Sequence, residues 1–237
     1  MPFISSNQTR VLYGTKSLAA LLRTVSPSVN FDMLETTTLA DTSKTFQPGL
    51  EDISLNIDGL FDSTDTAFDN FIAAITNQAT RPTSVAPNGF AVTNPVWLMG
   101  TKTISYEVSS AVADLVSFSM AFGSGTAPGL GVSLADLAAI TATGNGTSVD
   151  NGAGTTNGGI ANLHITAASG TSPTLAVVIQ HSTNNSTWST LASFTSATAT
   201  TSEQITFTGT VNRYVRASYT AGGTTPSFTC QVSLARN

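Results

Sequence analysis

Apolar and polar residues alternate along much of the chain, and this period of two predicts a mainly β protein. In residues 50–61, Ile53, Leu55 and Ile57 alternate with polar side chains, as in a strand with one buried face. Further strands are expected at residues 97–106 and 115–122. The second of these has its apolar face at Val116, Phe118, Met120 and Phe122.

A helical period appears once, over residues 64–76. Its apolar stripe falls at positions i, i+3, i+4 and i+7, namely Phe68, Phe71, Ile72 and Ile75. Ser63 or Thr64 can cap its first turn, and Asp65 is favourably placed there. We therefore expect one helix, with the stripe packed on the core.

Residues 160–237 read as a second β-rich part, because short alternating runs recur with turn residues between them. The expected strands are 160–167, 174–181, 188–195, 203–207, 214–219 and 228–235. This spacing predicts a C-terminal β-sandwich of jelly-roll or immunoglobulin-like type. Residues 126–159 are rich in glycine and are interpreted as a linker or an elaborated loop, in which 133–140 is either helix or strand.

The segment 32–49 is long and polar, and it is rich in threonine and aspartate. A loop of this length is unusual inside a compact domain. Its residue types are compatible with strands, so we expect its backbone partners to come from another chain.

Charged residues make up only 10% of the chain, against about 25% in typical soluble domains. The net charge is −5, which disfavours tight binding to nucleic acid. Residues 1–136 hold 12 acidic and six basic residues, a net of −6, and residues 137–237 hold two acidic and three basic, a net of +1. No apolar run is long enough for a transmembrane helix and no signal peptide is evident, so no membrane association is expected.

No motif for catalysis, metal binding or a cofactor stands out. His164 and His181 fall in expected strands without helix-spaced partners, and Cys230 lies on an apolar strand face with Phe228 and Val232. Paired carboxylates near residues 51–69 are explained by a strand end and a helix start. We expect a non-enzymatic protein with no metal and no cofactor.

The order of motifs from Thr36 to Asp62 resembles the major tail tube proteins of long-tailed, non-contractile bacteriophages. A threonine- and aspartate-rich loop leads through Pro48-Gly49-Leu50 into an alternating strand that ends in Gly59-Leu-Phe-Asp62. The resemblance covers roughly residues 10–125. It implies a tail-tube β-sandwich with one flanking helix over residues 1–125, followed by the C-terminal sandwich on the exterior of the tube.

The resemblance also implies self-assembly. Six copies would join their sheets into a ring, the rings would stack into a hollow tube, and the loop 32–49 would reach a neighbouring copy. The interface residues expected on this basis are Leu34, Thr37, Leu39, Asp41, Lys44, Phe46, Pro48 and Gly49. The other partners would be the tape measure, terminator and tail tip proteins. DNA would pass through the lumen without specific binding, in a virion tail assembled in the host cytoplasm.

Two other functions remain open from the sequence. The chain is also compatible with a capsid decoration or baseplate protein that forms discrete rings. Residues 160–236 resemble β-sandwich modules of phage virion proteins, some of which bind sugars, so a carbohydrate-binding surface module is the second alternative. Trp188 and Tyr219 are its candidate sugar-stacking residues, with packing at a turn as the competing interpretation.

Overall fold

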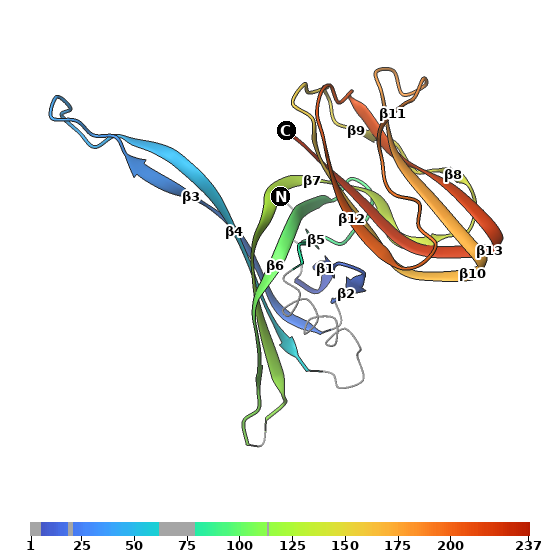
Figure 1. Cartoon of the computed structure of the whole chain (residues 1–237), viewed down its shortest axis with the longest axis horizontal. Helices are drawn as coiled ribbons and strands as arrows, with labels where there is room; N and C mark the ends of the chain where they lie inside the picture. Colours follow the sequence, from blue (N-terminus) through green and yellow to red (C-terminus); the bar gives the residue numbers. More distant parts are fainter. Residues whose placement is uncertain (1–5, 19–20, 62–78, 113) are drawn as a thin grey trace. The chain divides into compact units, whose positions relative to one another are not determined.

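The computed structural model describes residues 6–18, 21–61, 79–112 and 114–237, and these are mainly β (Figure 1). The helix predicted over 64–76 lies outside the described residues. The described elements are η1 (Ser6–Gln8), a 3-10 helix, and the strands β1 (Arg10–Tyr13), β2 (Lys16–Ser17), β3 (Leu22–Glu35), β4 (Phe46–Leu60), β5 (Arg81–Ala86), β6 (Pro95–Ser109), β7 (Ser117–Ile140), β8 (Gly144–Asn145), β9 (Val149–Asp150), β10 (Gly159–Ser182), β11 (Ser189–Ser193), β12 (Thr201–Phe207) and β13 (Tyr214–Arg236). In this part of the chain, no helix is long and apolar enough to cross a membrane.

The chain divides into two compact units. The first, here the sandwich unit, contains residues 1–20, 81–100 and 129–237, and the second, the hairpin unit, contains residues 21–80 and 101–128. Charge separates along the same division. The hairpin unit holds 11 acidic and three basic residues, a net of −8, and the sandwich unit holds three acidic and six basic, a net of +3.

In the hairpin unit, antiparallel strands lie in the order β3-β4-β7-β6. Ile53, Leu55 and Ile57 of β4 are buried, as the alternation in residues 50–61 predicts. They share a face with Phe118, Met120 and Phe122 of β7, which are also buried, so both predicted apolar faces are confirmed.

The sandwich unit is organised by the long antiparallel pair β10 and β13. Their pairing runs from Gly159↔Arg236 to Ser182↔Tyr214, with irregular register near Ser169–Thr174. Strands β12 and β7 extend the half of the pair that includes Gly159, and β11, β8 and β9 extend the other half. Both halves contribute to a single buried core, so the bent pair forms the two layers of a sandwich.

This arrangement confirms the strands expected in residues 160–236, but four of them merge into two. Residues 160–167 and 174–181 belong to β10, and residues 214–219 and 228–235 belong to β13. Gly170 and Gly223 have φ angles of 120° and 96°, so the glycines taken as turn residues bend the strands without ending them.

The glycine-rich segment interpreted as a linker is in large part strand. β7 runs without interruption from Ser117 to Ile140 and pairs with β13 over residues 132–140, so 133–140 is strand. Glycine occurs at these positions because β7 packs too closely against the neighbouring strand to admit a larger side chain. A Cβ at Gly131 would collide with the Leu234 carbonyl oxygen, and one at Gly129 would lie 2.5 Å from the Ala235 Cβ.

Candidate subunit interface

The ends of β3 and β4, residues 31–50, form a two-stranded arm that continues beyond the part of β4 paired with β7 (Figure 1). In the arm, Met33 pairs with Pro48, Leu34 with Gln47 and Glu35 with Phe46. The expectation that this segment lacks partners within its own chain is therefore wrong. Its backbone hydrogen bonds are made locally, because the threonine-rich turn folds the two halves onto each other.

A β-bulge determines which side chains share each face of the arm. Asp32 lies opposite both Gly49 and Leu50, since Phe31 pairs with Glu51 and Met33 with Pro48. Paired residues project to the same side, and residues alternate along β3. The first face, here the apolar face, carries Phe31, Met33, Phe46 and Pro48, with Glu35 and Glu51 on the same side at its two ends. The second face carries Asp32, Leu34, Gln47, Gly49 and Leu50.

The apolar face is a continuation of the buried face of the hairpin unit. Val25, Pro27 and Val29 of β3 pair with Ile57, Leu55 and Ile53, and Phe31 and Met33 follow them at the same period. Further along the arm this stripe is no longer covered. The exposed fractions are 54% for Phe31, 60% for Met33 and 49% for Phe46.

The second face also exposes large apolar side chains, with Leu34 58% and Leu50 81% exposed. A two-stranded ribbon with no packed face is marginally stable in water. Contiguous exposed apolar surface of this kind marks an interaction site on soluble proteins. The side chains of the arm therefore require a partner.

The tip of the arm is a hydrogen-bonded turn. The Asp41 amide donates to the Thr38 carbonyl over 3.0 Å, and Asp41 Oδ2 accepts from the Thr38 amide at 2.6 Å and the Thr38 hydroxyl at 3.0 Å. These bonds lower the pKa of the Asp41 carboxyl. Leu39, inside this turn, is fully exposed, so the turn presents one apolar side chain to solvent.

The remaining predicted interface residues support the same hairpin. The Thr45 amide donates to the Thr37 hydroxyl over 3.0 Å, and Lys44 Nζ lies 3.4 Å from Glu35 Oε2 across the strands. A Cβ at Gly49 would lie 3.2 Å from the Asp32 Cβ, so glycine suits the bulge. All eight predicted residues thus lie on the arm. Phe31, Met33 and Leu50 belong to the exposed set but were not predicted, because without the register nothing distinguishes them from core residues.

Trp188 and Tyr219 do not lie together. Tyr219 is 6% exposed in the sandwich core, and burial raises the pKa of its hydroxyl. The Arg216 guanidinium, three residues earlier on β13 and so on the opposite face, lies 4.1 Å from the centre of the Trp188 ring. The two aromatic rings therefore do not form a shared sugar-stacking platform.

The two histidines and the cysteine are structural. His164 is fully buried, with Nδ1 2.7 Å from the Gly14 carbonyl and Nε2 2.9 Å from the Ser84 hydroxyl. Burial lowers its pKa to about 4. His181 Nδ1 accepts from the Asn212 amide over 3.2 Å. Cys230 is buried in the sandwich core, as predicted.

The described residues include no group of three or more His, Cys, Asp or Glu side chains that could hold a metal ion. The packing of the described residues leaves the large apolar side chains of the arm exposed. We therefore take the arm as the candidate functional site.

Comparisons with known proteins give distant likenesses only. No family model and no curated protein matches the chain. Among solved structures, a chain from the virion of a native gene transfer agent particle is 15% identical, with a TM-score of 0.45, over 54% of this chain and 98% of that one. The SPP1 tail tube is 13% identical with a TM-score of 0.44, over 51% and 75%. The SPP1 Dit protein, described as part of a hub adsorption apparatus of phages infecting Gram-positive bacteria, is 10% identical with a TM-score of 0.41, over 96% and 98%.

Proposed function

We propose that this chain is a structural subunit of a phage tail that polymerises into stacked hexameric rings, forming a hollow tube for DNA passage. The observation that carries the proposal is the uncovered apolar face of the arm. Its side chains continue the core-facing stripe of the hairpin unit but lie 49% to 60% exposed in the single chain. A neighbouring copy that covers this face would complete the packing that the stripe begins.

The sheet of the hairpin unit also offers an edge for ring formation. Among the described strands, β3 pairs with β4 alone, so its outer edge is open from Leu22 to Glu35. An open edge of this length is a template for a strand of another chain. Head-to-tail addition of identical subunits closes into a ring when the rotation permits. The number six comes from the sequence resemblance of residues 36–62 to tail tube proteins.

The charge of the hairpin unit is consistent with passage of DNA through the proposed tube. The hairpin unit carries a net charge of −8, and a ring multiplies that charge around its axis. Such a wall repels phosphate, so DNA would not adhere to it. In this proposal the C-terminal sandwich of residues 160–237 lies on the exterior, other tail proteins bind at the ends of the tube, and the protein resides in the virion tail.

The test is negative-stain electron microscopy of the purified full-length protein over a range of concentrations, with light scattering as a measure of mass. We expect hollow tubes of uniform diameter above a critical concentration. Discrete rings that never stack would point instead to a baseplate or capsid decoration protein. A monomer at all concentrations would contradict both kinds of assembly.

A further inference from the structure

The arm tip and one surface of the sandwich unit have complementary chemistry. Leu39 is the apex of the tip, and Asp41 Oδ1 accepts no hydrogen bond from the residues that the structure describes. Residues 31–52 contain five acidic residues and one lysine, a net charge of −4. The arm therefore requires a receptor that is apolar at its centre and basic at its rim.

The described part of the sandwich unit offers a place of this kind. Leu130 of β7 is 63% exposed, and within the described part of this unit it is the one large hydrophobic residue that is exposed. It borders a recess of about 240 Å³ lined also by Val132, Leu234, Thr155 and Arg236. The cavity left by truncating one buried leucine in a protein core is about 150 Å³, so the recess has room for one leucine side chain.

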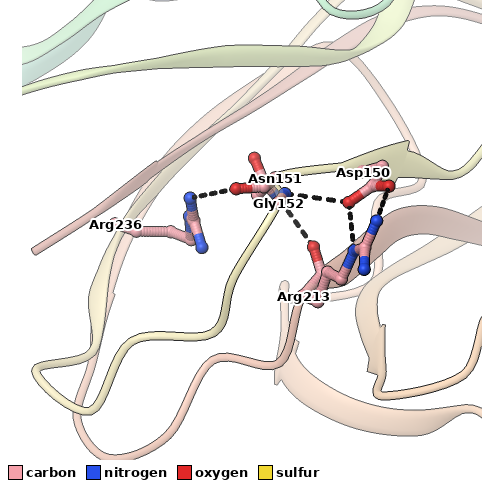
Figure 2. A network of polar contacts seen from close by, with 5 residues as sticks. All are labelled: Asp150, Asn151, Gly152, Arg213 and Arg236. Carbon is pink, nitrogen blue, oxygen red and sulfur yellow. Dashed lines mark hydrogen bonds and ion pairs between the residues drawn. The ribbon is translucent and has the colours of Figure 1, made fainter.

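Arg236 supplies the positive charge at this recess, and the nearby Asp150 carboxylate is bonded to Arg213 instead (Figure 2). Asp150 accepts two hydrogen bonds of 2.6 Å from Arg213 and one of 2.8 Å from the Gly152 amide. Arg236 instead donates to the Ala153 carbonyl at 2.6 Å and to the Asn151 carbonyl at 3.5 Å. Among the described residues, no carboxylate lies within ion-pair distance of Arg236.

We propose that the arm tip of one copy inserts Leu39 into the recess beside Leu130 of a second copy, with the acidic tip facing Arg236. The inference rests on the proposed assembly and names the surface that receives the arm. Charge favours it over a contact with another hairpin unit, because the arm is −4 and the sandwich unit is +3.

Cysteine pairs test this contact directly, because the native Cys230 is buried. The double variant Leu39→Cys, Leu130→Cys would be assembled and treated with a short bifunctional maleimide. We expect covalent dimers and larger species on a denaturing gel. The control pair Leu39→Cys, Thr187→Cys places the second thiol on an exposed loop of the same unit and should remain at the monomer mass.

A charge test uses single substitutions at an exposed position, where folding is little affected. Leu130→Asp should raise the critical concentration for assembly at least tenfold more than Leu130→Lys, because only the aspartate repels the acidic tip. Equal effects of the two substitutions would overturn the inference. The inference would also be overturned if tubes form but residues 39 and 130 do not cross-link, or cross-link only within one chain. Either result would leave the proposed tube intact. The absence of tubes from the unmodified protein would refute both.

Discussion

Replacing Phe46 with serine tests whether the apolar face of the arm docks on a neighbouring copy. Phe46 is 49% exposed in the single chain, so assembly would remove about half of its side chain from water. Full burial of such a side chain contributes about 1.5–3 kcal/mol, so losing the docking contact costs about 1 kcal/mol per subunit. A difference of 1.4 kcal/mol corresponds to about a tenfold change in an association constant. The critical concentration should therefore rise about fivefold.

The triple variant Phe31→Ser, Met33→Ser, Phe46→Ser extends the same reasoning. The three side chains are each about half exposed, and their summed loss is about 3 kcal/mol by the same area relation. The critical concentration should then rise about a hundredfold. The free chain should lose little stability, because surface substitutions usually change the free energy of unfolding by less than about 0.5 kcal/mol each.

The assay is sedimentation of assembled protein over a concentration series, with thermal denaturation of the dilute chain alongside. Gln47→Ser is the matched control, since Gln47 neighbours Phe46 in β4 but lies on the opposite face of the arm. Unchanged assembly of the triple variant would refute the docking role. An equal defect from Gln47→Ser would show that the arm acts without regard to its faces.

Three further predictions concern the sandwich unit. Gly131→Ala should lower the free energy of unfolding by about 1–3 kcal/mol, because a methyl group there collides with the Leu234 carbonyl. Gly144→Ala, with no atom within 4 Å of the new carbon, should leave the melting temperature unchanged. An equal effect of the two substitutions would refute the steric explanation. The pKa of His164 is lowered to about 4 from 6.5, so the unfolded chain binds more protons between these values and stability should fall as the pH drops from about 6.5 to 4. Denaturant titrations should show about 3 kcal/mol lost over that window, and His164→Gln should remove the loss; a variant that keeps the same pH dependence would assign it to other groups. Burial raises the pKa of Cys230 to about 12, so Ellman's reagent at pH 8 should label it only after unfolding, and stoichiometric labelling of the native protein would contradict this.

The sequence pattern predicts the structure best where one face of a strand is buried. The alternation around Ile53, Leu55 and Ile57 and the burial of Cys230 are confirmed because one face of each strand contacts a core. Glycine was the least reliable indicator. At Gly131 it permits close approach of two strands, and at Gly170 and Gly223 it bends a strand that continues, so neither role is a loop.

The arm shows a second limit of prediction from the sequence. Its residues could be selected from the threonine- and aspartate-rich pattern, but their pairing depends on the turn at Thr38–Asp41 and on the bulge at Gly49. Neither is evident from hydrophobic periodicity. The division into two units was equally hidden, because each unit collects segments that are distant in sequence.

That scattered connectivity has a consequence during synthesis on the ribosome. The hairpin unit ends at residue 128, so all of it can leave the exit tunnel while most of β10 and β13 is still untranslated. The Gly14 carbonyl, by contrast, cannot form its hydrogen bond until His164, 150 residues later, has been synthesised. Contacts of such long sequence separation form slowly. A nascent chain would therefore expose the apolar side chains of the arm before the sandwich unit can fold.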